Sequence, residues 1–247
     1  MSSSSDVVGD CPGDIKGRAC RAWRSLVLVT AFLASTLVGA QSFPDKPIKL
    51  IVPMPPAGTT DNMCRLAGQK LAEILGQPVI VENRAGANGN IGSDFVSKAP
   101  PDGYTLLVSG VGSQGINATL YRNMPYDVVE GLTHIAMISK GPNALAVTGL
   151  TRRAALADVP TVAESGFPGF EAESWTGISG PPNMPAEVVA KLNAAMLRAV
   201  RLPDVRERFA SPGLDAAPGT PEQMKAFVRN EVTKWGKAVR SSGAKVD

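Results

Sequence analysis

The sequence predicts an α/β fold in which helices cover a parallel sheet. Two observations carry this prediction: short β-branched apolar runs alternate with segments of helical periodicity, and the connections between them are short. Strands that are joined through helices lie parallel in one sheet, because such crossovers have a fixed hand. The composition agrees, since 44% of the 247 residues are hydrophobic and 19% are charged, as in ordinary globular domains.

The first elements follow in order along the chain. Residues 48–53 (IKLIVP) are predicted to form a buried strand, and a helix starts at Thr60 and ends at Gly76. Residues 78–83 (PVIVEN) are predicted to form a second buried strand. A glycine-rich loop, a short helix over 93–99 and a third strand over 104–108 come next.

The C-terminal part is predicted to be helical. One helix starts with Pro185 at its first position, and the last helix has Thr220 as N-cap, Pro221 next to it and Gln223 completing a capping box. The apolar face of that last helix is expected to pack in the core rather than to bind a cofactor; it comprises Met224, Phe227, Val228, Val232, Trp235 and Val239.

The N-terminus has the pattern of an export signal. Arg18, Arg21 and Arg24 precede an apolar run that ends in the small residues Gly39 and Ala40, so residues 1–40 are expected to be a signal peptide, with cleavage before Gln41. The alternative is a membrane anchor, but the run is shorter than the roughly 20 residues that a span needs. No second run of spanning length follows, so no stable membrane insertion is expected after cleavage.

Several function classes are disfavoured by composition and motifs. Aromatic residues are sparse at 5% and the net charge of +3 is scattered, which argues against nucleic-acid binding. With one histidine, and only Cys64 left after the leader, neither a metal site nor an internal disulfide is expected. No cofactor motif and no catalytic residues are expected, and His134 is interpreted as structural rather than as a general base. The loop acids Glu164, Glu171 and Glu173 are interpreted as solvated.

The stretch VPMPPAGTTD (52–61) is the candidate ligand seat. It lies where the first strand meets the first helix, and in parallel α/β sheets ligands bind at the carboxyl ends of strands. The first turn of that helix offers unpaired N–H groups and the positive end of the helix dipole, which suit an anion. Asp61 either caps the helix or grips a ligand group.

The glycine-rich loop after the second strand is a weaker candidate. Gly86, Gly89 and Gly92 are spaced G-x-x-G-x-x-G, which is not the dinucleotide fingerprint. The loop is either a backbone seat for a carboxylate or a flexible turn. Its neighbours Asn83, Asn88 and Asn90 either donate amide hydrogens or stabilise turns.

Several stretches together resemble the periplasmic solute-binding receptors of the tripartite tricarboxylate transporters, the Bug proteins. The resemblance covers nearly all of residues 41–247. The stretches that carry it are VPMPPAGTTD, VENRAGANGNIG, KAPPDGYTLL, INATLYRNMPYD, DVPTVAESGFPGFEAESWTG and the terminal TPEQ and KWGKAV.

The resemblance implies a type II periplasmic-binding-protein-like fold whose two lobes close on a small carboxylate, which is handed unchanged to membrane subunits of the transporter. It implies a periplasmic protein that is not an enzyme and needs no cofactor or metal. The ligand-binding residues that it implies are Pro56, Ala57, Gly58, Thr59, Thr60, Asp61, Asn83, Gly89, Ser109, Ser113 and Gln114.

The chain departs from the family pattern at several positions. Met54 replaces a common aromatic residue, Ala57 a common first glycine, Ala85 a frequent proline and Asn88 a frequent glycine. A larger departure follows Asn143, where a block on the order of 50 residues or more, enough for most of a lobe, is absent.

The expected organisation reflects that absence. Residues 41–140 form the N-terminal part of a largely complete first lobe, and residues 141–150 a truncated crossing between lobes. Residues 151–247 form a return segment with helices that pack on the first lobe. The expected function is a carboxylate receptor. The alternative is a truncated, degenerate or repurposed family member that binds no solute and acts in interaction or sensing.

Overall fold

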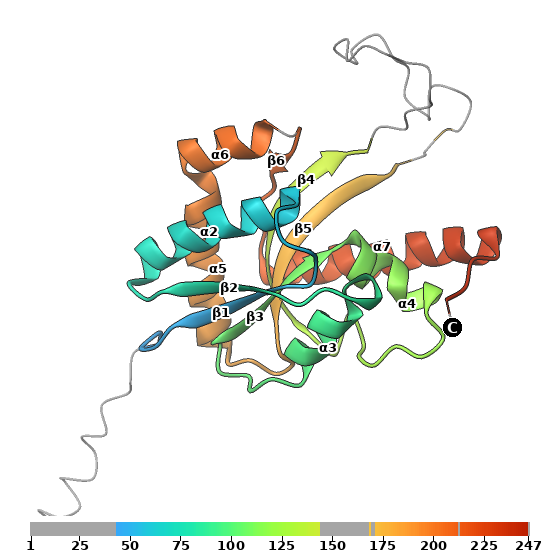
Figure 1. The fold of residues 1–247 in the computed structure, drawn as a ribbon, viewed down its shortest axis with the longest axis horizontal. Helices are drawn as coiled ribbons and strands as arrows, with labels where there is room; N and C mark the ends of the chain where they lie inside the picture. The colour runs from blue at the N-terminus through green and yellow to red at the C-terminus, as the bar shows by residue number, and fades with distance from the viewer. Residues whose placement is uncertain (1–42, 144–167, 169–170, 212, 247) are drawn as a thin grey trace, which may run out of the picture. The chain divides into compact units, whose positions relative to one another are not determined.

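The computed structural model describes residues 43–143, 168, 171–211 and 213–246. The chain divides into two compact units, 1–42 and 43–247, so the expected signal peptide lies outside the described residues. The second unit contains one six-stranded sheet with the strand order β2-β1-β3-β5-β4-β6 (Figure 1). The α/β class predicted from the sequence is confirmed.

The N-terminal half of this unit alternates strands and helices as predicted. Its elements are β1 (Ile48–Val52), α2 (Thr59–Leu75), β2 (Val79–Asn83), a tight turn at Ala87–Gly89, α3 (Asn90–Ser97), β3 (Thr105–Gly110), a π-helical turn (Val111–Ile116) and α4 (Asn117–Leu120). Strands β2 and β3 both pair parallel to β1. Helix α2 ends at Gly76, which adopts a left-handed conformation with φ 71°.

The C-terminal half completes the sheet. Its elements are β4 (Thr133–Pro142), β5 (Glu173–Gly180), α5 (Ala186–Arg201), α6 (Pro203–Ala210), β6 (Asp215–Ala216) and α7 (Pro221–Ser242). Pro185 is the N-cap of α5 rather than its first residue. The predicted capping box of α7 is present, because Thr220 accepts from the Gln223 backbone and the Gln223 side chain accepts from Thr220.

The prediction of a purely parallel sheet is wrong in one respect. Strand β5 lies between β3 and β4 and is antiparallel to both. The first four strands, β1 to β4, therefore run in one direction. Strand β5 and the short β6 beside β4 run in the opposite direction. The reason is the return path: β5 begins at the end of the sheet where β4 finishes, with Glu173 of β5 paired to Pro142 of β4. A strand that starts beside the end of its neighbour has to run back along it.

The prediction that the second strand is buried is also wrong. Among the described strands, β2 is at the edge of the sheet and pairs with β1 alone. The side chain of Ile80 is 50% exposed, and the other residues of the strand are half-buried. Apolar runs in edge and central strands look alike in a sequence, because the neighbour that buries them comes from another part of the chain.

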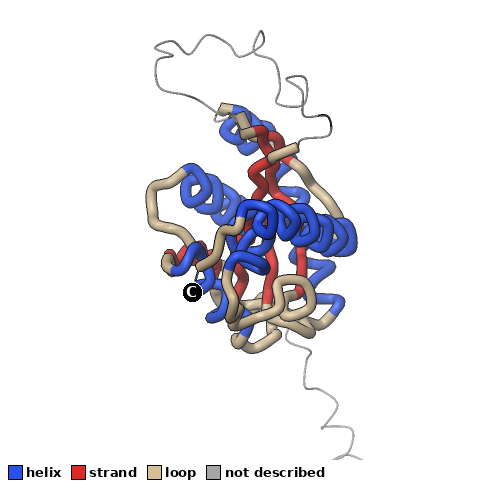
Figure 2. The backbone as a smooth tube through the Cα atoms, turned by 90° about the vertical axis from the view of Figure 1, so that its right-hand side faces the viewer, coloured by secondary structure: helices blue, strands red, loops and turns tan. Residues whose placement is uncertain are grey.

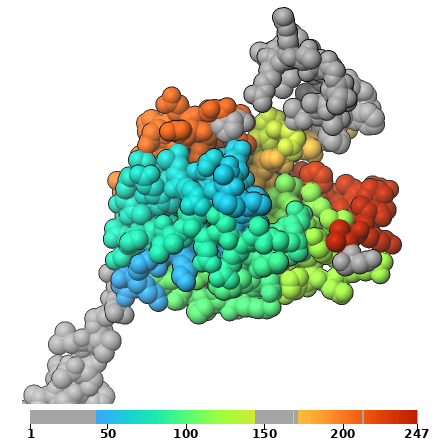
Figure 3. All heavy atoms as spheres, viewed as in Figure 1, coloured from blue at the N-terminus to red at the C-terminus, as the bar shows by residue number. Residues whose placement is uncertain are grey.

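Helices cover both faces of the sheet (Figures 1 and 2). Helices α2, α5 and α6 contact one another on one face, and Figure 3 shows α6 (orange) next to α2 (cyan). On this side the alternate residues Ile48, Leu50 and Val52 of β1 are buried in the main core. Ile51 and Leu107 point to the other face, which α3, α4 and α7 cover. Cys64 packs in the main core, and burial raises the pKa of its thiol to about 12.

Candidate functional site

Three loops meet at the carboxyl ends of β1, β2 and β3. They are the segments 53–58, 84–89 and 111–116. A Cβ added to Gly92 would lie 2.9 Å from the Cβ of Pro53, and one added to Gly89 would lie 3.1 Å from the Cβ of Ser113. Glycine is therefore favoured at the end of the second loop, where Gly89 packs against the third loop, and at Gly92 in the first turn of α3, which packs against the first loop. The candidate residues of the three motifs are brought to one end of the sheet.

The first loop is tied down by Asp61 in the first turn of α2. Asp61 is 2% exposed, and its Oδ2 accepts hydrogen bonds from the Ala57 backbone N–H at 2.9 Å and from Arg65 Nε at 2.9 Å. The hydrogen bond from Arg65 is the main cause that lowers the pKa of Asp61 to about 2. The carboxyl group is therefore ionised at neutral pH and anchors the loop.

Asn83 at the end of β2 completes this anchor. Its Nδ2 donates to Asp61 Oδ1 at 2.8 Å and to the Met54 carbonyl at 3.1 Å, while its Oδ1 accepts from Arg65 Nη2 at 2.8 Å. The sequence left open whether Asp61 caps the helix or grips a ligand. In the structure both Asp61 oxygens and the Asn83 amide are hydrogen-bonded within the protein. These two side chains therefore hold the backbone of the candidate seat in place.

The backbone of the first loop faces outward. Pro56, Ala57, Gly58 and Thr59 are exposed and Thr60 is half-buried. Gly58 is the N-cap of α2, and no side chain among the described residues caps this helix end. The first N–H groups of a helix have no intrahelical acceptor, and the helix dipole places positive potential there. This end of α2 can therefore accept an anionic group.

Ala57 occupies a conformation that favours glycine. Its φ is 68°, in the left-handed region, and its N–H points to Asp61. Most residues meet a steric penalty there because of their Cβ. The departure noted in the sequence, alanine where a glycine is common, is thus located at a strained position of the seat.

The second loop is held by an asparagine cluster. Asn88 Nδ2 donates to Asn117 Oδ1 at 2.6 Å, and Asn117 Nδ2 donates to the Asn88 carbonyl and to Asn90 Oδ1. Asn90 and Asn117 are buried. Of the two open roles for these amides, the contacts favour the stabilisation of turns.

The end of β3 and the third loop contribute buried polar side chains. Ser109, Ser113 and Gln114 are at most 1% exposed. Ser109 Oγ bonds to Ser179 Oγ at 2.8 Å and accepts from Gln114 Nε2 at 2.9 Å. Within the described residues, Ser113 Oγ and Gln114 Oε1 are buried without a hydrogen-bond partner. Unpaired buried polar atoms are costly, so they mark positions where a partner would be stabilising.

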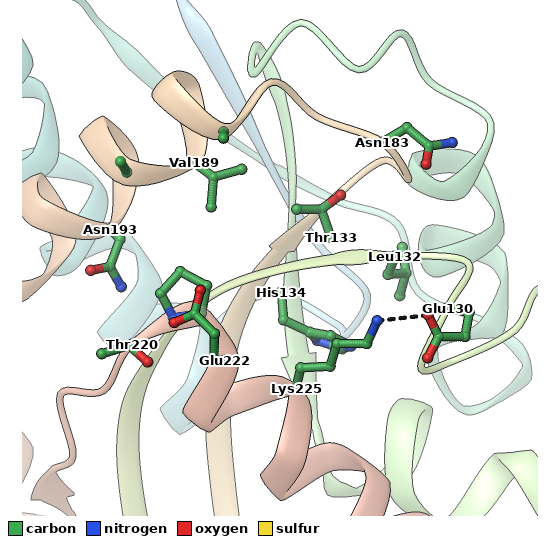
Figure 4. Close-up of a pocket in the computed structure, with 13 residues that line it drawn as sticks. Glu130, Leu132, Thr133, His134, Asn183, Val189, Asn193, Thr220, Glu222 and Lys225 are labelled. Carbon is green, nitrogen blue, oxygen red and sulfur yellow. Dashed lines mark hydrogen bonds and ion pairs between the residues drawn. The ribbon is translucent and has the colours of Figure 1, made fainter.

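A cavity of about 640 Å³ lies elsewhere (Figure 4). It is lined by the start of β4 and by the first turns of α5 and α7 and includes Thr133, His134, Asn193 and Lys225. Because β4 runs parallel to β1, Thr133 lies at the opposite end of the sheet from the loop after Val52. Lys225 in this cavity is paired with Glu130 at 2.6 Å. The cavity is therefore separate from the candidate seat.

The structure gives no support to catalysis by the other residues considered. His134 is 3% exposed, and burial lowers its pKa to about 4, so the ring is neutral and enclosed. Glu171 and Glu173 are exposed, and Glu173 pairs with Lys140; Glu164 lies outside the described residues. Within the described part of the chain, no cluster of three or more His, Cys, Asp or Glu side chains could hold a metal ion.

Sequence reasoning missed several residues of the site. Arg65 could have been found from its position four residues after Asp61 on the predicted helix, a spacing that favours an ion pair. Asn117 and Ser179 gave no local signal, because their partners Asn88 and Ser109 are 29 and 70 residues away.

Comparisons with known proteins agree with the fold and with the sequence resemblance. A family model described as tripartite tricarboxylate transporter family receptor matches residues 63–148 and 140–244. A UPF0065 protein from the tcbD-tcbE intergenic region of Pseudomonas sp. strain P51 is 28% identical over 324 positions, covering 93% of this chain and 96% of that protein. The protein BugT of Bordetella pertussis is 27% identical, covering 90% and 96% of the two chains.

Solved structures share the fold. The protein Rpa4515 of R. palustris, solved with adipate, matches with a TM-score of 0.75 at 23% identity, over 83% of this chain and 100% of that one. The periplasmic binding protein BugD matches with a TM-score of 0.73 at 23% identity, over 82% and 99% of the two chains. MatC of Rhodopseudomonas palustris, solved with malate, matches with a TM-score of 0.70 at 23% identity, over 80% and 100%.

The alignment with the Pseudomonas protein spans more positions than this chain has residues. It is 324 positions long, whereas the chain has 247 residues, so it includes positions at which this chain has no residue. The two matches to the family model meet at residues 140–148, a range that contains the junction after Asn143.

Proposed function

Because this chain belongs to the receptor family of the tripartite tricarboxylate transporters, we propose that it is a solute receptor for a small carboxylate. The carboxylate binds at the uncapped start of α2 and passes unchanged to the membrane subunits of the transporter. The observation that carries this proposal is the convergence of three loops around a helix N-terminus that has no side-chain cap.

The relatives support the class of ligand. Two solved structures of the same fold were obtained with adipate and with malate, both of which carry two carboxyl groups. In this chain the backbone N–H groups of Gly58, Thr59 and Thr60 at the start of α2 provide donors for one carboxylate. Asp61 and Asn83 hold that backbone in place. The buried residues next to the proposed site are Gly89, Ser109, Ser113 and Gln114.

The proposed location is the periplasm, after cleavage of the leader. The basic and apolar pattern of residues 1–40 supports export, and the relative BugD is described as a periplasmic binding protein. None of the helices in the described part of the chain is long and apolar enough to cross a membrane.

A second candidate function follows from the gap in the alignments. Two lobes that close on a ligand exclude water and thereby strengthen each polar contact. If most of the second lobe is deleted after Asn143, the seat is an open groove with much lower affinity. The second candidate is therefore a family member that binds no solute and acts in interaction or sensing. The length of the alignment with the Pseudomonas relative favours it.

Calorimetry on purified residues 41–247 separates the two candidates. The panel contains succinate, adipate, malate, citrate and benzoate, and each acid is recovered afterwards to check that it is unchanged. Binding of at least one acid is the expected result. A folded protein, shown by circular dichroism, that gives no heat with any acid supports the second candidate, and turnover of an acid contradicts the non-enzymatic proposal.

Two glycine variants locate the site. Gly58 has φ −75°, and a Cβ added there would meet nothing within 4 Å, so Gly58→Ala should fold normally. Its methyl group would occupy the space beside the free N–H groups of α2, so we expect binding to weaken roughly tenfold or more, about 1.4 kcal/mol. Gly219→Ala adds a methyl group just before α7, remote from the seat, and should bind as the unaltered protein does. Equal affinities for both variants would place the ligand elsewhere.

A further inference from the structure

Four buried side chains form a continuous hydrogen-bonded chain that starts at Gln114, in the third loop of the candidate seat, and ends at His134 on β4. Gln114 Nε2 lies 2.9 Å from Ser109 Oγ, Ser109 Oγ lies 2.8 Å from Ser179 Oγ, and Ser179 Oγ lies 3.3 Å from His134 Nδ1. All four residues are at most 3% exposed. We call this set, Gln114, Ser109, Ser179 and His134, the polar relay. It crosses from the π-helical turn through β3 and β5 to β4.

The direction of the relay follows from its last member. His134 Nε2 lies 3.3 Å from the Val129 carbonyl oxygen, which can only accept a hydrogen bond. Nε2 must therefore carry the proton. In the neutral ring Nδ1 is then an acceptor, and the hydroxyl of Ser179 has to donate to it.

The remaining orientations follow in sequence. Since the proton of Ser179 is directed at His134, Ser109 has to donate its own proton to Ser179. Ser109 can then only accept from Gln114, so the amide nitrogen Nε2 faces Ser109 and the amide oxygen Oε1 faces away. Oε1 is buried and has no partner among the described residues. The Val129 carbonyl thus determines, through three side chains, which end of the Gln114 amide is free.

We propose that His134 and Ser179 are positioning residues for the candidate site, which keep the Gln114 carbonyl oxygen available to accept a hydrogen bond from a bound acid. This inference rests on the proposed function, in which Gln114 belongs to the site. A free acceptor favours a ligand that has a hydrogen-bond donor besides its carboxylates, such as a hydroxyl group. A ligand without that donor leaves Oε1 unpaired.

The surroundings of His134 keep the ring neutral. The charged groups that face it are Glu130 before β4 and Glu222 and Lys225 on α7, and Lys225 is paired with Glu130 (Figure 4). The residues of α5 that line the same cavity are uncharged: Ala186, Val189, Ala190 and Asn193. Burial is the largest cause that lowers the pKa of His134, and Lys225 adds to it. Protonation of Nδ1 would make it a donor to Ser179 and release the Ser179 proton, so the orientations of Ser109 and of the Gln114 amide would no longer be fixed.

The imidazole tautomer tests the relay directly. His134 is the single histidine of the chain, so nitrogen-15 NMR of the imidazole gives one unambiguous pair of signals. We expect the Nε2–H tautomer, unchanged from pH 8 to pH 5.5. The Nδ1–H tautomer, or a charged ring at pH 7, would overturn the inference, and this result does not depend on ligand binding.

Ligand selectivity tests the positioning role. Malate and succinate differ by one hydroxyl group, and the unaltered protein should bind malate more tightly. Ser179→Ala interrupts the relay and frees the amide, so the preference for malate should fall roughly two- to tenfold, the worth of one hydrogen bond. The matched control is Ser139→Ala, because Ser139 is equally buried in the same sheet and its Oγ has no partner in the described structure.

The outcomes are distinguishable. Two results contradict the positioning role when both acids bind. In the first, Ser179→Ala keeps the full preference for malate over succinate. In the second, the unaltered protein shows no preference for malate. If neither acid binds while the protein is folded and the Nε2–H tautomer is present, the proposed function is contradicted for these acids and the relay orientation stands.

Discussion

Asn83 Nδ2 lies 2.8 Å from Asp61 Oδ1 and links the end of β2 to the first turn of α2. The two residues are 22 positions apart in the chain, and Arg65 bonds to both of them. This triad holds the exposed loop 53–58 in one conformation before any ligand arrives. A seat that is ordered in advance loses less conformational entropy on binding.

Asp61 is expected to make stability fall in acid. Its folded pKa of about 2 lies below its ordinary value of 3.8, so its contribution is complete above about pH 4 and is lost as the pH falls toward 2. The size is about 2 kcal/mol. Urea denaturation should show Asp61→Asn less stable than the unaltered protein at pH 5, with a difference that shrinks below pH 3. A difference that stays constant with pH would contradict this role, and Asp215→Asn, in exposed β6, is the control.

His134 is expected to control stability in a separate pH range. Its folded pKa of about 4 is below the ordinary 6.5, so the unfolded chain binds a proton between these values and the folded protein does not. The contribution of neutral His134 to the free energy of unfolding is fully present above pH 6.5. It falls by about 3 kcal/mol as the pH drops to 4. His134→Asn should lose this pH dependence in denaturation experiments at pH 7.5 and pH 5. A slope that persists in the variant would show that another group titrates.

Ala57→Gly is expected to stabilise the protein. Glycine adopts a φ of 68° without the steric penalty that alanine has there, which more than offsets its greater flexibility in the unfolded chain. The expected gain in the free energy of unfolding is about 0.5–1 kcal/mol. Ala85→Gly, in the neighbouring loop and at a position without a positive φ, should be neutral or slightly destabilising. Equal effects of both substitutions would show that Ala57 is not strained.

Glu231 is expected to be the critical side chain between α7 and β5. It is 3% exposed, and its Oε2 accepts from Trp175 Nε1 at 3.0 Å and from Trp235 Nε1 at 2.8 Å. Glu231→Ala leaves a buried indole N–H unpaired and should cost about 3 kcal/mol, whereas Glu231→Gln retains an acceptor and should cost less.

Tryptophan fluorescence of residues 41–247 measures this effect, because Trp175 and Trp235 are the two tryptophans of that part of the sequence and Trp23 precedes it. Lys237→Ala, exposed on the same helix, is the control and should leave the unfolding midpoint unchanged. If Glu231→Ala also leaves it unchanged, the buried contact has no net stabilising role.

Local elements were predictable because their signals lie within a few residues of one another. The Thr220 capping box and the stop at Gly76 depend on backbone groups three or four positions away, and both occur where they were expected. The helical face of α7 was likewise evident from the spacing of its apolar residues, of which Met224 and Val228 are fully buried. The loop positions at the ends of the first three strands were also foreseeable, since parallel strands end at one edge of the sheet.

The sequence by itself therefore determined the α/β class, most helices and strands, the family resemblance and the three loops of the candidate seat. Only the tertiary structure decided that β5 runs antiparallel between β3 and β4, that β2 is an edge, and that Asp61 and Asn83 are bonded to the backbone of loop 53–58. The polar relay was also visible only in the tertiary structure. Two of its three hydrogen bonds join residues that are far apart in the chain: Ser109 and Ser179 are separated by 70 positions, and Ser179 and His134 by 45. The physical reason is that burial and hydrogen-bond partners depend on which distant segments pack together, and a single sequence carries no local signal for that choice.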